Sequence, residues 1–280
     1  MFKSYSIFLS LALSVLLFIS FSQQAEDKPD APFSDALPQV IRSVNLDQEY
    51  SFAGETMPSE NFDAVERLDR ELSVNSYWHS STLLNIKSTG RYFPVIEPIL
   101  AEHGVPDDFK YLAVIESNLR NVTSPSGAKG IWQFLKSTGQ HYGLEVNSEV
   151  DERYHLEKAT HAACRMLKDY YSEFGSWTLA AAGYNMGETR LRKQLASQKA
   201  KTYYDLNLNQ ETSRYIFRIL AVKEIYQDPQ AFGFYLEDKD FYTPLIESNT
   251  ITVDGSVASW GDFAVDNGTC LLYTSDAADD

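Results

Sequence analysis

The feature that most restricts how this 280-residue chain can fold is a long stretch of helical hydrophobic periodicity in its middle. From Asn61 to Gln230, apolar residues recur every three or four positions, and no alternating apolar–polar run of useful length interrupts them. Glycine and proline separate the segments. The predicted helices begin at Asn61 and then span 81–88, 92–102, 107–118, 157–174, 177–183, 188–197 and 211–226. We therefore predict an all-α domain at residues 59–235.

Residues 1–22 have the features of an export signal. Lys3 precedes an apolar run at 7–21, whose length suits the hydrophobic segment of a signal peptide and is short for a membrane-spanning helix. Ser20 and Ser22 supply small side chains near a cleavage point. An uncleaved N-terminal anchor is the alternative. In either case we expect the rest of the chain to lie in the periplasm or cell envelope.

Two more segments flank the helical region. Residues 23–58 are rich in Asp, Glu, Pro and Ser and show neither helical nor strand periodicity. We therefore predict a linker or poorly ordered lead-in. Residues 236–280 contain a strand-like stretch at 250–255 and an amphipathic stretch at 257–267. One strand and one helix cannot bury a core alone, so we interpret this region as the start of an incomplete α/β-type module. The residues from Cys270 onward break the pattern, and either a truncated gene product or a frayed acidic tail accounts for them.

The overall composition excludes several classes of protein. A formal net charge of −15 leaves no basic stripe for a nucleic-acid partner. Two cysteines support neither a disulfide framework nor a thiolate metal site, and Cys164 is interpreted as a core residue. The five histidines show no recognisable ligand spacing, so we expect no metal and no cofactor. We expect a monomer.

One predicted helix carries a carboxyl group where an apolar side chain is expected. Glu116 falls on the same helical stripe as Phe109, Leu112 and Ala113. Burial and the negative end of the helix would both raise its pKa. A carboxylic acid that stays protonated near neutral pH can donate its proton to a glycosidic oxygen. Solvation, or an ion pair with Arg120, is the alternative.

Groups suited to binding a sugar occur further along the chain. Small residues at 126–130 make a loop that a sugar can approach closely. Gln133 can present both a donor and an acceptor, while Tyr184 and Asn185 offer an amphipathic ring and an amide. Taken singly, Asn185 could be a turn or cap residue, and Tyr215 a packed aromatic side chain.

Taken together, these stretches resemble the SLT-type lytic transglycosylases of the lysozyme-like superfamily, in particular the membrane-bound lytic murein transglycosylase D group. Four blocks carry the resemblance: Glu116-Ser117, Ser126-Gly127-Ala128-Lys129-Gly130-Ile131-Trp132-Gln133-Phe134, Ala182-Gly183-Tyr184-Asn185-Met186-Gly187, and Glu211-Thr212 with Tyr215. They keep the family's order and cover roughly residues 61–234. Gly183 and Met186 stand where alanine is commoner in the family.

The resemblance implies a lysozyme-like, α-rich fold that acts on peptidoglycan glycan strands without metal or cofactor. Glu116 would be acid and base in cleaving the MurNAc–GlcNAc β-1,4 bond, with formation of 1,6-anhydromuramyl ends. The implied substrate-binding residues are Ser117, Ser126, Gln133, Tyr184, Asn185 and Tyr215. The hydroxyl of Tyr215 is expected to reach the catalytic carboxyl group. LysM-type repeats often follow this domain in the family, and residues 250–267 would be their beginning.

Two other functions remain open from the sequence. A muramidase would use the same fold and glutamate with water as the acceptor. A non-catalytic peptidoglycan-binding protein would bind the glycan strand without cleaving it. Membrane association would come through the N-terminal segment.

Overall fold

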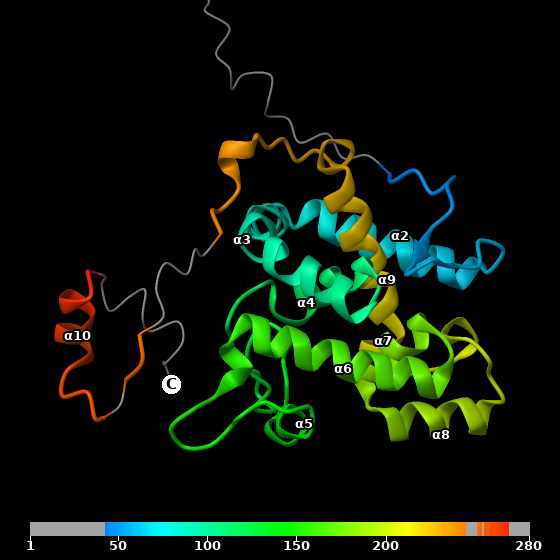
Figure 1. The fold of residues 1–280 in the computed structure, drawn as a ribbon. Coiled ribbons are helices and arrows are strands. Elements are labelled where there is room, and N and C mark those ends of the chain that lie inside the picture. Colours follow the sequence, from blue (N-terminus) through cyan, green and yellow to red (C-terminus); the bar gives the residue numbers. More distant parts are fainter. Residues whose placement is uncertain (1–42, 245–250, 254, 269–280) are drawn as a thin grey trace, which may run out of the picture. The chain divides into compact units, whose positions relative to one another are not determined.

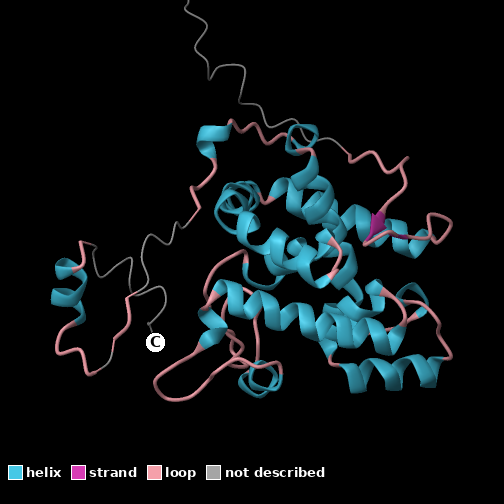
Figure 2. Ribbon diagram, in the orientation of Figure 1, coloured by secondary structure: helices cyan, strands magenta, loops and turns pink. Residues whose placement is uncertain are grey.

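The computed structural model describes residues 43–244, 251–253 and 255–268, and helices dominate it (Figures 1 and 2). The helices are α2 (Phe62–Tyr77), α3 (His79–His103), α4 (Lys110–Ser117), α5 (Lys136–His141), α6 (Leu156–Phe174), α7 (Trp177–Met186), α8 (Glu188–Gln198), α9 (Gln210–Gln227) and α10 (Trp260–Asp266). Short 3-10 turns are η1 (Asp107–Phe109), η2 (Glu152–Tyr154), η3 (Tyr203–Asp205), η4 (Pro229–Phe232) and η5 (Asp238–Asp240). Strands β1 (Ser51–Phe52) and β2 (Glu55–Thr56) form one antiparallel hairpin. The α-rich prediction is confirmed.

The helix ends follow local sequence signals. The side chain of Asn61 accepts hydrogen bonds from the first turn of α2, and that of Ser176 does the same for α7. Gly104 and Gly175 end α3 and α6 in the left-handed conformation, which glycine adopts without steric cost. Such signals lie next to the residues they act on, so the sequence reveals them.

The prediction of separate helices at 81–88 and 92–102 is wrong, because α3 runs unbroken through both. Pro94 and Pro98 lie inside it. Each proline removes one backbone donor, but burial of Ile96, Ile99 and Leu100 outweighs that local loss. Helix α5 was not predicted, since its six residues carry no apolar stripe.

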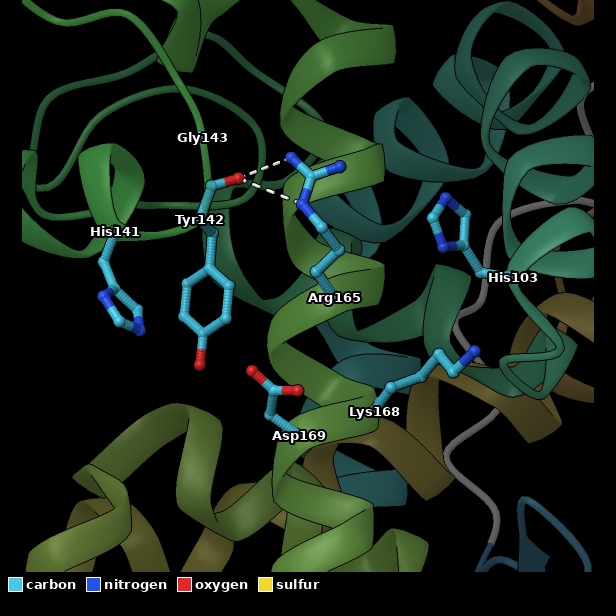
Figure 3. A pocket seen from close by; sticks show the side chains of 7 residues that line it. All are labelled: His103, His141, Tyr142, Gly143, Arg165, Lys168 and Asp169. Atoms are coloured by element: carbon cyan, nitrogen blue, oxygen red, sulfur yellow. Dashed lines mark hydrogen bonds between the residues drawn. The ribbon is translucent and has the colours of Figure 1, made fainter.

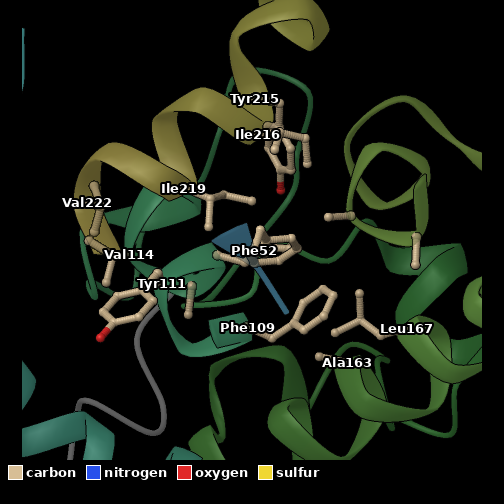
Figure 4. Close-up of a cluster of buried hydrophobic side chains, with 14 of the residues drawn as sticks. Phe52, Phe109, Tyr111, Val114, Ala163, Leu167, Tyr215, Ile216, Ile219 and Val222 are labelled. Atoms are coloured by element: carbon tan, nitrogen blue, oxygen red, sulfur yellow. The ribbon is translucent and has the colours of Figure 1, made fainter. Parts of the chain in front are cut away.

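The predicted lead-in at 23–58 is wrong at its C-terminal end. Tyr50, Phe52 and Met57 are buried, and Phe52 packs edge-on against Phe109 with ring centroids 5.0 Å apart (Figure 4). A hairpin this short is too small to be stable alone, so the periodicity that marks longer strands is absent from it. Its order comes from packing against helices far away in the sequence.

The hairpin also caps a helix of the site. The carboxylate of Glu55 accepts hydrogen bonds from the Ser176 hydroxyl at 2.7 Å and from the backbone N–H groups of Trp177 and Thr178 at 2.5 and 3.0 Å. These donors form the first turn of α7, where a negative charge is favourable.

The helical domain extends past residue 235, where the predicted module was to begin. The backbone N–H of Tyr242 donates to the Lys87 carbonyl at 2.9 Å, so residues 241–244 lie along α3. A Cβ atom at Gly90 would come within 2.8 Å of Phe241, so only glycine admits this approach. The predicted boundary at 236 is wrong. The segment that packs along α3 has no helical or strand periodicity, so the sequence gives no sign that it belongs to the domain.

The remaining C-terminal predictions are met in part. Residues 251–253 form no strand, while Thr250 and Asp254 lie outside the described residues. Helix α10 falls within the predicted 257–267 stretch, and Ser259 caps it. Residues 1–22 and Cys270 also lie outside the described residues. Within the described segments, no helix has the length and apolar character needed to cross a bilayer.

Helix α4 lies in the middle of the core, between α3 and α9 (Figure 1). Tyr111, Leu112, Ala113 and Val114 are all at most 5% exposed, so α4 is buried on nearly every side. The expectation of a buried helix carrying Glu116 is confirmed.

Candidate functional site

Glu116 lies in the last turn of α4, where the central helix approaches the surface. Its side chain is half-buried, unlike the fully buried residues of the preceding turn. Arg120, the alternative partner for this carboxylate, is exposed. The residue is therefore largely surrounded by protein and still partly accessible from outside.

Tyr215 is the hydrogen-bond partner of this carboxyl group. It projects from α9 with its ring 2% exposed, and its hydroxyl donates to Oε1 of Glu116. The two residues lie 99 positions apart and are brought together by the packing of α4 against α9. The contact expected from the resemblance is present.

The surroundings of Glu116 favour its neutral form. Burial raises its pKa to about 7, although the hydrogen bond from Tyr215 and the positive charge of Arg218 both lower it. The negative charge of Glu211 adds to the rise. The site can therefore hold a proton near neutral pH and still release it, which general acid–base catalysis requires.

Tyr184 and Asn185 reach the same region from the end of α7. The Tyr184 hydroxyl donates to the carbonyl of Trp132 at 2.6 Å, and burial and the charge of Glu116 raise its pKa well above the usual value. The amide oxygen of Asn185 accepts from Thr212 at 2.9 Å, and its nitrogen lies 3.5 Å from a carboxylate oxygen of Glu211. Tyr184 therefore connects α7 to Trp132, and Asn185 connects α7 to α9.

The Gly-rich loop is organised differently from the expectation. The amide nitrogen of Gln133 donates to the carbonyls of Val122 and Gly130, at 2.9 and 2.7 Å, so it stabilises the loop. Gly130 is approached by Arg153, since a Cβ atom there would lie 1.9 Å from the Arg153 carbonyl oxygen. The interpretation of Gly130 as space for a sugar is wrong, because protein backbone occupies that space.

The two serines of the predicted set lie in contrasting environments. Ser126 is exposed at a turn, and its hydroxyl is 2.9 Å from that of Ser124. Ser117 is 4% exposed, and its hydroxyl donates to the Ala113 carbonyl at 3.3 Å. Only Ser126 therefore presents an exposed hydroxyl group.

Buried Arg153 supports the loop from beneath and has no sequence signal. Its guanidinium donates to the carbonyls of Gly127 and Phe134, both at 3.1 Å, and pairs with Asp151 at 2.6 Å. Trp132 of the same loop is fully buried, and its indole N–H donates to Thr160 at 2.9 Å.

Non-glycine residues with positive φ concentrate near Glu116. Asn118 and Leu119 directly follow α4, with φ of 55° and 54°, and Gln133 has φ of 51°. The amide of Asn85 donates to Asn118 at 2.9 Å and supports this conformation. Strained backbone that the surrounding structure maintains is typical of functional sites.

Arg218 and Glu211 are charged neighbours of Glu116 on α9 whose effect was not predicted. Arg218 donates to the Ile115 carbonyl at 3.1 Å, and both charges influence the pKa of Glu116. Their spacing of three and four residues from Tyr215 places them on its side of α9, a signal that could have identified them.

A pocket lies elsewhere, between α3, α6 and the end of α5 (Figure 3). It measures about 470 Å³ and is lined by His103, His141, Tyr142, Gly143, Arg165, Lys168 and Asp169. Burial and His161 hold the pKa of His103 below its usual value. Glu116 does not line this pocket, so its size does not identify the catalytic centre.

A family model matches part of this region. Residues 94–207 match the transglycosylase SLT domain, a range that contains Glu116, the loop, Tyr184 and Asn185. Tyr215 lies beyond it.

Individual proteins show the same likeness. The chain is 32% identical over 187 residues to membrane-bound lytic murein transglycosylase D of Escherichia coli, covering 65% of this chain and 40% of that protein. It is 25% identical over 112 residues to a putative tributyltin chloride resistance protein of Alteromonas, covering 39% of this chain and 53% of the other. Among solved structures, the 70 kDa soluble lytic transglycosylase of Escherichia coli matches with a TM-score of 0.45 at 18% identity, covering 61% of this chain and 34% of that one. This chain thus spans less than half the length of the transglycosylase it matches.

Proposed function

We propose that this protein is a peptidoglycan lytic transglycosylase whose catalytic acid and base is Glu116, a proposal that the match of residues 94–207 to the transglycosylase SLT domain supports. The observation that carries the proposal is the carboxyl group of Glu116, half-buried, hydrogen-bonded by Tyr215 and with a pKa near 7. A lone carboxyl group with that pKa can serve as both proton donor and proton acceptor in one cycle.

The proposed reaction begins with proton transfer from Glu116 to the oxygen between MurNAc and GlcNAc. As the bond from that oxygen to the muramyl C1 breaks, the substrate's own 2-acetamido group stabilises the positive charge at C1. The Glu116 carboxylate then takes the proton of the muramyl C6 hydroxyl group, whose oxygen bonds to C1. Glu116 regains its proton, no water is consumed, and the product carries a 1,6-anhydromuramyl end.

Tyr215 is a positioning residue in this scheme, because its hydroxyl orients the carboxyl group without contacting the reacting bond. Glu211 maintains the proton on Glu116 through its negative charge, and Arg218 limits that effect. Asn185 and Tyr184 would contact the sugar, with Ser126 at the loop edge and Gln133 through its amide oxygen. Buried Ser117 would act through the end of α4.

We further propose export to the cell envelope, directed by residues 1–22. The relative of this chain is named as membrane-bound, and peptidoglycan lies outside the cytoplasmic membrane. We place the catalytic domain at residues 44–244, since the hairpin and the segment along α3 both pack against the helical core.

The deciding experiment is digestion of purified sacculi by the wild-type protein and by Glu116→Gln, with mass spectrometry of the released muropeptides. We expect anhydromuropeptides from the wild type and a loss of activity of about 10²–10⁴-fold in the variant. Glu157→Gln, which removes a partly exposed carboxylate on α6, is the matched control and should retain activity.

Each alternative function has its own outcome. Products heavier by one water would identify a muramidase, with water in place of the C6 hydroxyl as acceptor. Undiminished digestion by Glu116→Gln would remove the catalytic role of this residue. Binding to sacculi without any release of muropeptides would indicate a non-catalytic glycan-binding protein.

A further inference from the structure

Two imidazole rings meet where the end of α3 crosses α6. Nε2 of His103 and Nδ1 of His161 are 2.8 Å apart, and the ring centroids are separated by 5.1 Å. The carboxylate of Glu102 lies beside them, so that one ligand atom from each of the three residues falls within 4.8 Å of the other two. The histidines are 58 positions apart, which is why no ligand spacing shows in the sequence.

The two ring nitrogens in contact share one proton, and a metal ion could take the place of that proton. In a hydrogen bond between two imidazoles, one nitrogen donates a proton and the other accepts it with a lone pair. A cation that replaces this proton would be bound by a lone pair from each ring. Two imidazoles on a tetrahedral zinc ion, with Zn–N of about 2.0–2.1 Å, have nitrogens about 3.3 Å apart. The rings therefore need to separate by only about 0.5 Å, which side-chain rotation provides.

The local charges act in both directions. His103 is the last residue of α3, so the negative end of that helix lies next to the pair, and Glu102 adds a full negative charge. Arg165 and Lys168 of α6 oppose a cation. The guanidinium of Arg165, however, is turned toward the Tyr142 carbonyl, to which it donates from Nε at 3.1 Å (Figure 3). Arg165 and Lys168 both remain as opposing charges beside His103.

We propose that Glu102, His103 and His161 form a binding site for a divalent transition-metal cation, with Zn²⁺ as the ion that suits two imidazoles and one carboxylate best. Three protein ligands leave a fourth position for water. The site lies apart from the residues that surround Glu116 and goes beyond the transglycosylase reaction. Its physical effect is to join the end of α3 to α6, just ahead of the segment that leads into α4.

The test uses the full chain without an oligohistidine tag, stripped of metal and titrated with Zn²⁺ by calorimetry at neutral pH. We expect one equivalent to bind and the thermal unfolding temperature to rise, because the ligands come together only in the folded state. His103→Gln, His161→Gln and Glu102→Gln should each weaken binding by at least about tenfold. Titration with Co²⁺ should give the absorption bands of a tetrahedral site with nitrogen and oxygen ligands.

Two further variants keep the test decisive if a ligand substitution disturbs folding. Lys168→Gln retains all three ligands and should tighten Zn²⁺ binding, since it removes one of the two opposing charges. His141→Gln, which changes the adjoining pocket outside the proposed ligand set, should leave binding unchanged. Absence of one-equivalent binding in the wild type would overturn the proposal. Binding that persists in His161→Gln, or is lost in His141→Gln, would do so as well.

Discussion

The proton on Glu116 is controlled by a few side chains around one carboxyl group. Burial favours the neutral acid, and the Tyr215 hydroxyl favours the carboxylate by donating to it. Glu211 and Arg218 act in opposite senses from neighbouring turns of α9. Because burial is the largest of these effects and the others modify it in both directions, the loss of one should move the pH range in which the protein works.

Tyr215→Phe removes the donor and keeps the ring. We expect the pKa of Glu116 to rise, because the carboxylate loses its stabilising hydrogen bond, so the alkaline limb of the pH–activity profile should move to higher pH. Activity at neutral pH should fall by about tenfold as the carboxyl group loses its orientation. Rates of sacculus digestion across pH would measure both effects.

The matched control is Tyr204→Phe. The Tyr204 hydroxyl is buried and makes no hydrogen bond within the described residues, so its loss should leave the profile unchanged. An alkaline limb that stays in place in Tyr215→Phe would rule out control of the Glu116 proton by Tyr215.

At the scale of elements, the site depends on the loop between Val122 and Phe134. This loop has little regular structure, and Arg153 supports it through two of its carbonyl groups. Its backbone also accepts the hydrogen bond of Tyr184 at Trp132. Damage to the loop should therefore affect both stability and the wall of the site.

Two glycines of the loop test this role. Gly130 has φ of +78° and no room for a side chain, so Gly130→Ala should destabilise the fold by at least about 2 kcal/mol and reduce activity. Gly127 has a similar φ of +80° but open space around it, so Gly127→Ala should cost only about 1 kcal/mol. Urea unfolding of both variants measures the difference. Equal losses would show that backbone conformation alone, and not contact with Arg153, requires glycine at position 130.

At the scale of the whole molecule, the position of Glu116 at the end of a central helix costs folding free energy. The domain surrounds α4 with α3 and α9, and the carboxyl group belongs to the same packed structure. A charged carboxylate is less favourable there than in the unfolded chain. The site is thus maintained by the stability of the rest of the domain.

Glu116→Gln should show this cost as a function of pH. The pKa of Glu116 is raised from 4.5 to about 7 in the folded state, so its contribution to stability is intact below about pH 4.5 and is lost as pH rises through 7. The variant should match the wild type at pH 4 and exceed it by about 1–3 kcal/mol at pH 8. Denaturant unfolding at the two pH values measures the difference, and a gap that does not widen with pH would contradict the raised pKa.

Local patterns were sufficient to predict most of the helices, the buried stripe that carries Glu116, the core position of Cys164, and the blocks shared with a family. Helical periodicity, capping residues and short motifs are properties of neighbouring residues, so they can be read from the chain. The same patterns missed the β1–β2 hairpin and the segment along α3, whose stability comes from packing against distant helices.

The contacts that make the site work join distant parts of the chain. Tyr215 reaches Glu116 across 99 positions, and Arg153 donates to the Gly127 and Phe134 carbonyls of the loop across 26 and 19 positions. The His103–His161 pair forms only where α3 crosses α6. A sequence specifies which side chains are present and which helix face each occupies. The approach of two faces, and the burial that shifts a pKa, arise only when the helices pack together.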